Sequence, residues 1–412
     1  MRKMKARRLL LSVLLLALIA PPIADAAPKK IAVKVLLPNG SVNGVSALAS
    51  FAISGNSILI LDSDTESATN PVLRAFASDG SEKWKLSLDS GSGSYASAIA
   101  PDAIGNIWVV GASGVAPAPA VVSSESNTVK ALQTDPFLLD PQSPLRPDLT
   151  QLTLWQVSNS GALIQKFTKD FSSALLPTGI SISGSQIGVI GITASATTNS
   201  SFFINCTTSG TFSNQVSIGK SDAVLDNLLQ KSDGSALLLG SSSSSIQKEK
   251  LIGKRDAFVI SLSKSGSILQ VLRSSNKLST RTWQSATTSL FLGGNAILGK
   301  KSEAVMTKFD SKFQPLWTQR FPASSSALVV APDSKRYFSA FTSTAAIAAL
   351  SNWKPISGQV VILNNDLKGI VQGGYAPKGA INSRFFGFTP ELGVILIADV
   401  GDHLAFFPSI SR

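Results

Sequence analysis

The residues that most clearly indicate a chemical role, by their type and their positions, are a cluster of lysines and arginines near the middle of the chain. A concentrated basic surface attracts polyanions such as wall teichoic polymers, anionic lipid headgroups or nucleic acid. Only Trp283 lies nearby as a stacking aromatic, so the sequence carries no specific nucleic-acid signal. We predict a binding surface for a protein or an anionic cell-envelope polymer, and the alternative is solvated side chains that only aid solubility. The cluster comprises Lys248, Lys250, Lys254, Arg255, Arg273, Lys277 and Arg281, with Glu249 and Asp256 as partial counterweights.

The acids form two smaller groups. Asp62, Asp64 and Glu66 have a spacing that can hold Ca²⁺ through oxygen ligands, but the segment lacks the glycine and the distant glutamate of an EF-type loop. Capping of a turn is the simpler role for them, so we predict no metal. Asp399 and Asp402 lie near the C-terminus. His403, the single histidine, follows Asp402, and we expect it to make a structural hydrogen bond.

No set of residues amounts to a catalytic signature, and we predict no catalytic residue and no cofactor. Sugar hydrolysis needs two carboxyl groups that face each other across the substrate. The internal repeats predict a ring of β-sheets around a central channel. Among the strands that would line this channel, only 222–229 offers acids, namely Asp222 and Asp226. Cys206 follows an apolar run and no histidine lies nearby, which indicates a structural thiol.

Two functions therefore remain. The favoured one is a secreted, non-catalytic binding or scaffold module. The alternative is an extracytoplasmic hydrolase or lyase that acts on glycans or polyanions, with acids supplied by Asp62, Asp64, Asp399 or Asp402.

The first 26 residues have the features of a secretory signal peptide. Five basic residues precede the apolar run Leu9–Ala20, Pro21 and Pro22 break it, and Ala24-Asp25-Ala26 supplies a cleavage site. Twelve apolar residues are fewer than the roughly 20 that a membrane span needs. We therefore expect export, with cleavage after Ala26. The chain loses five of its 37 basic and one of its 25 acidic residues, which leaves a net charge of +8.

The mature part, 27–412, has the composition of β-structure with many turns. Only 15% of the chain is charged, and small residues are abundant. With one cysteine, no intramolecular disulfide can form.

Internal repeats predict the architecture. One half-repeat consists of an alternating strand, a tight turn and a very apolar strand, and it occurs at 45–63, 95–113, 177–192, 222–241, 283–300, 325–343 and 381–399. A second half-repeat has a Ser/Asp-x-Gly turn, and it occurs at 72–88, 152–167, 201–216, 256–271, 304–319 and 358–372. Its seventh copy is split between 403–408 and 31–37. We therefore predict an all-β, single seven-bladed β-propeller with four-stranded blades, closed by pairing of strand 31–37 with strand 403–408.

The stretches DAFVISLSKSGSILQV (256–271) and AIAPDAIGNIWVVG (98–111) carry a resemblance to a known family. They resemble the SBBP-type β-propeller repeats of exported bacterial proteins, which are similar to WD40, YVTN and PQQ repeats. The resemblance implies a propeller fold over 31–408 and no particular activity. A ring of six or eight blades, a parallel β-helix and two β-sandwiches are the alternatives.

The propeller geometry predicts where a ligand would bind. The long insertions 114–150, 242–255 and 344–357 would all lie on one face, while the opposite face would carry tight turns. Because loops on a rigid scaffold often carry function, we expect the face with the insertions to bind the ligand.

Overall fold

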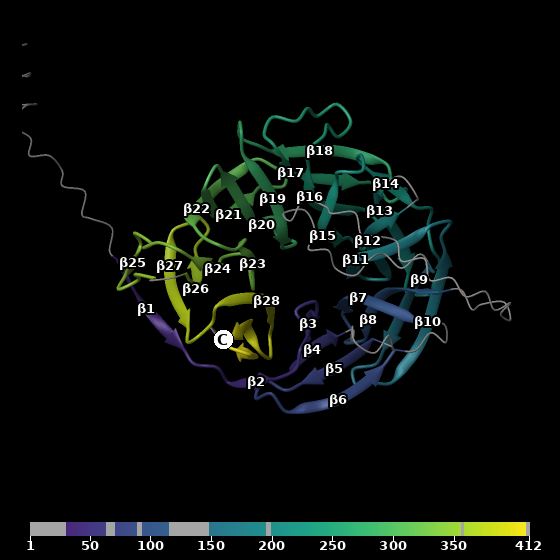
Figure 1. The fold of residues 1–412 in the computed structure, drawn as a ribbon, viewed down its shortest axis with the longest axis horizontal. Helices are drawn as coiled ribbons and strands as arrows, with labels where there is room; N and C mark the ends of the chain where they lie inside the picture. Colours follow the sequence, from purple (N-terminus) through teal and green to yellow (C-terminus); the bar gives the residue numbers. More distant parts are fainter. Residues whose placement is uncertain are drawn as a thin grey trace, which may run out of the picture.

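The protein is a ring of β-sheets. The computed structural model describes residues 30–62, 71–88, 93–114, 148–194, 199–355 and 358–408. In this part of the chain every regular element is a β-strand, and the sheets follow one another around a closed ring (Figure 1). The predicted all-β propeller class is confirmed. No helix among these residues is long and apolar enough to cross a membrane.

Six of the sheets are blades of four strands. In five of them the chain runs from an innermost strand to an outermost one, and the sixth takes its outermost strand from the N-terminal region (Figure 1). They are β3 (Ser50–Ser54), β4 (Ser57–Asp62), β5 (Val72–Phe76) and β6 (Glu82–Ser87); β7 (Ser94–Pro101), β8 (Ile107–Gly114), β9 (Leu149–Val157) and β10 (Leu163–Asp170); β11 (Ala174–Ser183), β12 (Gln186–Ala194), β13 (Asn199–Thr207) and β14 (Val216–Ile218); β15 (Val224–Gln230), β16 (Ala236–Ser242), β17 (Asp256–Leu262) and β18 (Ile268–Ser274); β19 (Thr280–Ala286), β20 (Phe291–Leu298), β21 (Lys301–Phe309) and β22 (Pro315–Pro322); and β28 (Asn382–Thr389), β29 (Gly393–Val400), β30 (His403–Phe407) and β2 (Gly40–Val42).

The remaining sheet has six strands. Its order is β23 (Leu328–Val330), β24 (Tyr337–Ser343), β26 (Gln359–Asn365), β27 (Val371–Pro377), β1 (Ile31–Leu36) and β25 (Leu350–Ser351). Strand β1 runs parallel to β27, with Val33 opposite Gly374. On its other edge β1 pairs with β25, which belongs to the connection between β24 and β26, and here Ile31 lies opposite Leu350.

The prediction of seven four-stranded blades closed by residues 31–37 is therefore wrong. Residues 31–36 pair with β27 and β25 in the six-stranded sheet and make no ladder with 403–407. The strand that pairs with β30 is β2, in which Gly40 lies opposite Phe406 and Val42 opposite Leu404. The apolar run 31–37 does form a strand, but its pattern does not specify its partner. Strand β2 has three residues, too few for an alternating pattern to appear.

The repeated turns follow from side chains that hydrogen-bond to the backbone just beyond them. In the β5–β6 turn, Asp79 Oδ1 accepts from the backbone N–H of Ser81 at 2.9 Å and from its hydroxyl at 2.6 Å. In the β26–β27 turn, Asp366 Oδ1 accepts from the N–H groups of Lys368 and Ile370 at 2.8 and 2.9 Å. These are the local bonds for which Asp and Ser are selected in turns.

Neighbouring blades are joined by a contact between an outermost strand and the next turn. The Trp84 indole of β6 lies against Gly161 in the β9–β10 turn, so close that a Cβ there would stand 2.6 Å from the ring. The same Trp84 donates its Nε1–H to the Asn159 carbonyl at 3.0 Å. Trp317 of β22 repeats both contacts, against Gly369 and to the Leu367 carbonyl at 3.1 Å.

The hydrophobic core is divided among the spaces between blades. One cluster joins Trp108 and Leu154 to Leu175 and Phe202 of the following blade. Such packing makes each blade depend on both neighbours. The ring is therefore complete only when its last blade packs against its first.

The closure by β2 gives a test. Val42 is 9% exposed and packs in the cluster that includes Ile58 of the first blade and Phe406 of the last, whereas Val35 of β1 is 65% exposed. We expect Val42→Asp to lower the melting temperature by several degrees, because it buries a charge at the closure. Val35→Asp should leave the melting temperature within about one or two degrees. Equal losses in the two variants, measured by circular dichroism, would contradict this closure.

Candidate binding surfaces on the two faces of the ring

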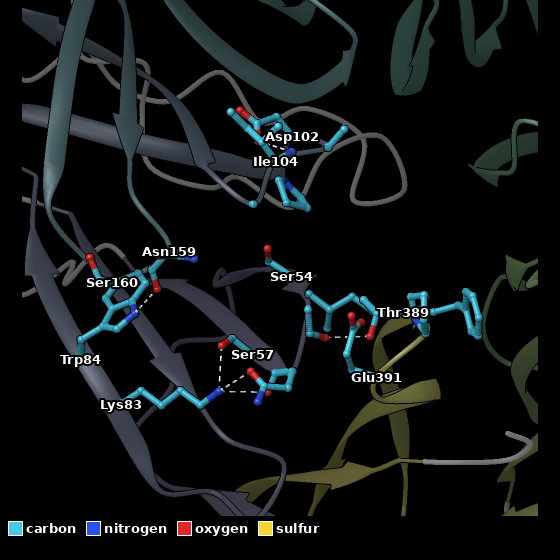
Figure 2. A pocket seen from close by; sticks show the side chains of 18 residues that line it. Ser54, Ser57, Lys83, Trp84, Asp102, Ile104, Asn159, Ser160, Thr389 and Glu391 are labelled. Carbon is cyan, nitrogen blue, oxygen red and sulfur yellow. Dashed lines mark hydrogen bonds between the residues drawn. The ribbon is translucent and has the colours of Figure 1, made fainter.

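The two ends of the strands define two faces with different content. We call the face that carries the hairpins 54–57, 101–107, 157–163 and 389–393 the turn face, and the opposite face, with the connections 242–256 and 274–280, the loop face. A hollow of about 700 Å³ lies on the turn face. Its walls come from the β3–β6 blade, the β7–β10 blade and the β28–β29 hairpin, so it spans three neighbouring blades (Figure 2).

The walls of this hollow are held by bonds within the protein (Figure 2). The Lys83 ammonium donates to the carbonyl and side-chain oxygens of Asn56, at 3.1 and 2.8 Å, and to the Ser57 hydroxyl at 2.9 Å. The Thr389 hydroxyl donates to the Gly55 carbonyl at 2.8 Å and thereby joins the last blade to the first. At another wall Asp102 accepts from the backbone of its own turn and, at 3.1 Å, from the Trp108 indole. The hollow is therefore preformed.

Other groups in the hollow have no internal task. The Ser54 hydroxyl, the Asn159 amide and the Glu391 carboxylate line the hollow and form no side-chain hydrogen bond with the described residues. Ile104 stands at the rim with 82% of its surface exposed. We predicted a ligand site on the loop face and did not predict this hollow. Its residues lie in ordinary turn sequences, and only the closure of the ring brings them together.

The seven predicted basic residues divide into two groups. Lys248, Lys250, Lys254 and Lys277 are exposed, and we call these four the lysine sector. Their two connections are bound together, since Lys254 donates its backbone N–H to the Ser279 carbonyl at 2.8 Å.

The three arginines lie beneath the surface, in contacts within the protein. Arg273 Nε is 3.3 Å from Asp256 Oδ2, with the two side chains 4% and 0% exposed. Arg255 is buried and donates to the Ser241 hydroxyl and the Asp222 carbonyl, both at 2.8 Å. The third, Arg281, is half-buried, and burial lowers its pKa. Removing one partner of a buried ion pair is costly, so truncation of Arg273 would destabilise the fold by leaving Asp256 without its ion-pair partner.

The other two insertions differ in what is known of them. Most of 114–150, from 115 to 147, lies outside the described residues. The insertion 344–357, described up to 355, packs on the six-stranded sheet with Ile347 and Trp353 buried, and β25 within it covers the free edge of β1.

Two of the acids that the sequence analysis named, Asp62 and Asp399, lie in contacts that explain them structurally. Asp62 accepts from the Ser46 N–H at 3.1 Å and lies 3.8 Å from Arg74. Asp399 is 3.2 Å from Arg384. Asp64 and Glu66 lie outside the described residues. Within the described ranges, no group of three or more His, Cys, Asp or Glu side chains is placed to hold a metal ion.

His403 makes a hydrogen bond with its neighbour Asp402. His403 Nδ1 lies 3.2 Å from Asp402 Oδ1, and this hydrogen bond lowers the pKa of the carboxyl group. Both line a cavity of about 120 Å³ with Asp399. Cys206 is buried, and burial raises the pKa of its thiol to about 12, so the nucleophilic thiolate is scarce at neutral pH.

Five innermost strands share a feature that the sequence did not indicate. Each contains a β-bulge, and the extra residue is polar in every one: Ser97, Thr178, Asp226, Gln284 and Arg384. Bulges re-aim side chains and often occur near functional sites. A bulge shifts the register by one residue, and no residue type marks it reliably in a sequence.

Asp226 is the bulge residue with the strongest perturbation. Burial raises its pKa to about 7, and the positive charge of Arg255 opposes the rise. Its Oδ2 is buried and makes no hydrogen bond with the described residues. Perturbed carboxyl groups of this kind occur both in functional sites and in structural networks.

The comparisons with known proteins concern the fold alone and give no function. No protein-family model and no curated protein matches the chain, so the resemblance to SBBP-type repeats stays a prediction. Similar solved structures include the WD40 domain of Toxoplasma gondii coronin, with TM-score 0.48 and 8% identity over 92% of this chain and 88% of that one. A Synechocystis apocarotenoid oxygenase has TM-score 0.46 and 10% identity over 80% and 71%. Pseudomonas brassicacearum lignostilbene dioxygenase has TM-score 0.45 and 9% identity over 80% and 72%.

Asp226, in β15, and Asp222, just before that strand, should change the stability of the fold with pH in opposite directions. Asp226 ionises near its ordinary value of 3.8 in the unfolded chain but near 7 in the folded one, so stability falls as pH rises between these values. Asp226→Asn should therefore raise the melting temperature at pH 8, by an amount that reflects a few kcal/mol at most, and change it little at pH 4.

Asp222 is the matched control for that measurement. Burial opposes its ionisation, but hydrogen bonds that include Ser242 and Ser243 outweigh burial and lower its pKa. Asp222→Asn should therefore lower the melting temperature at pH 8. A loss of stability at pH 8 in both variants would contradict the assignment of Asp226.

Proposed function

We propose that this chain is an exported, non-catalytic binding module that engages a protein or an anionic surface polymer, with the lysine sector as its contact with the polymer. The observation that carries the proposal is the exposure of Lys248, Lys250, Lys254 and Lys277 on two connections that are hydrogen-bonded to each other. Because the neighbouring arginines hold the base of these connections, the lysines stand on a fixed support. A fixed cluster of like charges gives a polyanion several contacts at once, and its binding then falls steeply with salt.

The second candidate is a hydrolase or lyase, and one observation favours it. Asp226 has a pKa of about 7, which suits a general acid at neutral pH. Such an enzyme needs a second carboxyl group facing the substrate. Asp62 and Asp399 are each bound to an arginine, which supports a structural role for them. We therefore favour binding.

Export with cleavage after Ala26 is part of the proposal, and the composition of residues 1–26 supports it. Protein recovered from the culture medium or the cell envelope should begin at Ala27. Intact-mass measurement checks this, and a mass that includes Met1–Ala26 in the exported fraction would contradict it.

The polymer contact is tested by removing charge in two places. The triple variant Lys248→Ser, Lys250→Ser, Lys254→Ser should elute from an anionic resin, and from isolated cell envelopes, at clearly lower salt than the parent protein. Its control removes three exposed lysines from other blades, in Lys85→Ser, Lys166→Ser, Lys312→Ser. The net charge of the two variants is equal. An equal change in elution would mean that only net charge matters, and the lysine sector would be rejected.

A further inference from the structure

The hollow on the turn face contains polar groups that the fold does not use. Ser54, Asn159 and Glu391 line it from three different blades (Figure 2). By contrast, Lys83, Asp102 and Thr389 are engaged within the protein. A volume of about 700 Å³ lies within the range of roughly 300–1,000 Å³ for small-molecule sites. These unused groups are therefore the ones available to a ligand.

We infer that this hollow binds a short oligosaccharide. A hydroxyl, an amide and a carboxylate together offer both donors and acceptors, with a single negative charge among them. Sugar hydroxyls can both donate and accept, so one sugar residue can donate to Glu391 while it exchanges hydrogen bonds with Asn159 or Ser54. This ligand and this face are distinct from the polyanion and the lysine sector of the proposed function.

The apolar part of the hollow fits the C–H faces of sugar rings. The Trp84 indole has its one N–H bonded to the Asn159 carbonyl, so the part of the ring that lines the hollow is apolar. Ile104, which is largely exposed, adds a second apolar surface at the rim. The Trp84 side chain is held by its contacts with Asn159 and Gly161 of the next blade, so this surface loses little freedom on binding.

Two other ligand classes fit less well. An anion would meet the carboxylates of Glu391 and Asp102, and the only ammonium in the lining, that of Lys83, already donates to three oxygens. A metal ion would have one unengaged carboxylate as its ligand, which is too few for a hard cation. A basic peptide remains as an outcome of the test, because it would also pair with Glu391.

The experiment measures binding of three soluble probes, maltotetraose, cellotetraose and chitotetraose, by saturation-transfer NMR and by titration calorimetry. At least one should bind the mature protein. The double variant Asn159→Ala, Glu391→Gln should weaken that binding about tenfold or more, since it removes one charged and one neutral hydrogen-bonding partner. The Asn159 carbonyl that accepts from Trp84 stays in place, so the fold should be retained.

The matched control changes the same residue types elsewhere. Asn214 and Glu249 are both exposed and do not line the hollow, so Asn214→Ala, Glu249→Gln should leave binding unchanged. No binding of any tetrasaccharide, or equal loss in both double variants, would overturn the inference. Binding of tetralysine that is stronger than that of every sugar and lost in the Asn159/Glu391 variant would also overturn it, in favour of a basic peptide.

The lysine variants keep this test separate from the proposed function. The triple variant at Lys248, Lys250 and Lys254 should bind the tetrasaccharide normally, and the Asn159/Glu391 variant should keep its retention on the anionic resin. Each proposal can therefore fail while the other stands.

Discussion

The packing of an outermost strand on the next blade's turn is the contact on which the other features depend. Trp84 donates a hydrogen bond to the Asn159 carbonyl and packs its ring against Gly161. Trp317 makes the same two contacts with Leu367 and Gly369. Phe167 lies against Gly210 in a related way. Because a side chain at the glycine would collide with the ring, the turn can approach only without a Cβ. The contact sets the distance and rotation between blades, and thereby the positions of groups that belong to different blades.

The two faces follow from this frame in different ways. On the turn face the hairpins are short and their Asp and Ser side chains bond to their own backbones, so few atoms remain for a ligand, and those that remain are fixed. On the loop face the connections are longer and are held from below by Arg255 and Arg273. The ring thus presents a hollow lined by polar and apolar groups on one face and exposed lysines on the other.

The sequence predicted the features that rest on local patterns. The strands, the Ser/Asp-x-Gly turns and the propeller class all come from alternation and turn chemistry, which act over a few residues. It did not predict that Gly40–Val42 closes the ring, because three residues carry no period and pairing is decided by the partner strand. Nor did it separate Arg255 and Arg273 from the lysines, since burial depends on the acids that lie opposite. The hollow, and the bulge at Asp226, depend on register and on neighbours distant in sequence.

The pairing of the N-terminal strands also determines the order in which the protein can fold. Ile31 lies opposite Leu350 and Gly40 opposite Phe406, so the two most N-terminal strands that the structure describes have partners far along the chain. Contacts of such high sequence separation fold slowly. Until the residues of β25, β27 and β30 have been synthesised, β1 and β2 cannot form these strand pairs, and the ring stays open. A nascent chain of this kind therefore stays without its complete set of strand pairs until nearly all of the residues that the structure describes have been synthesised.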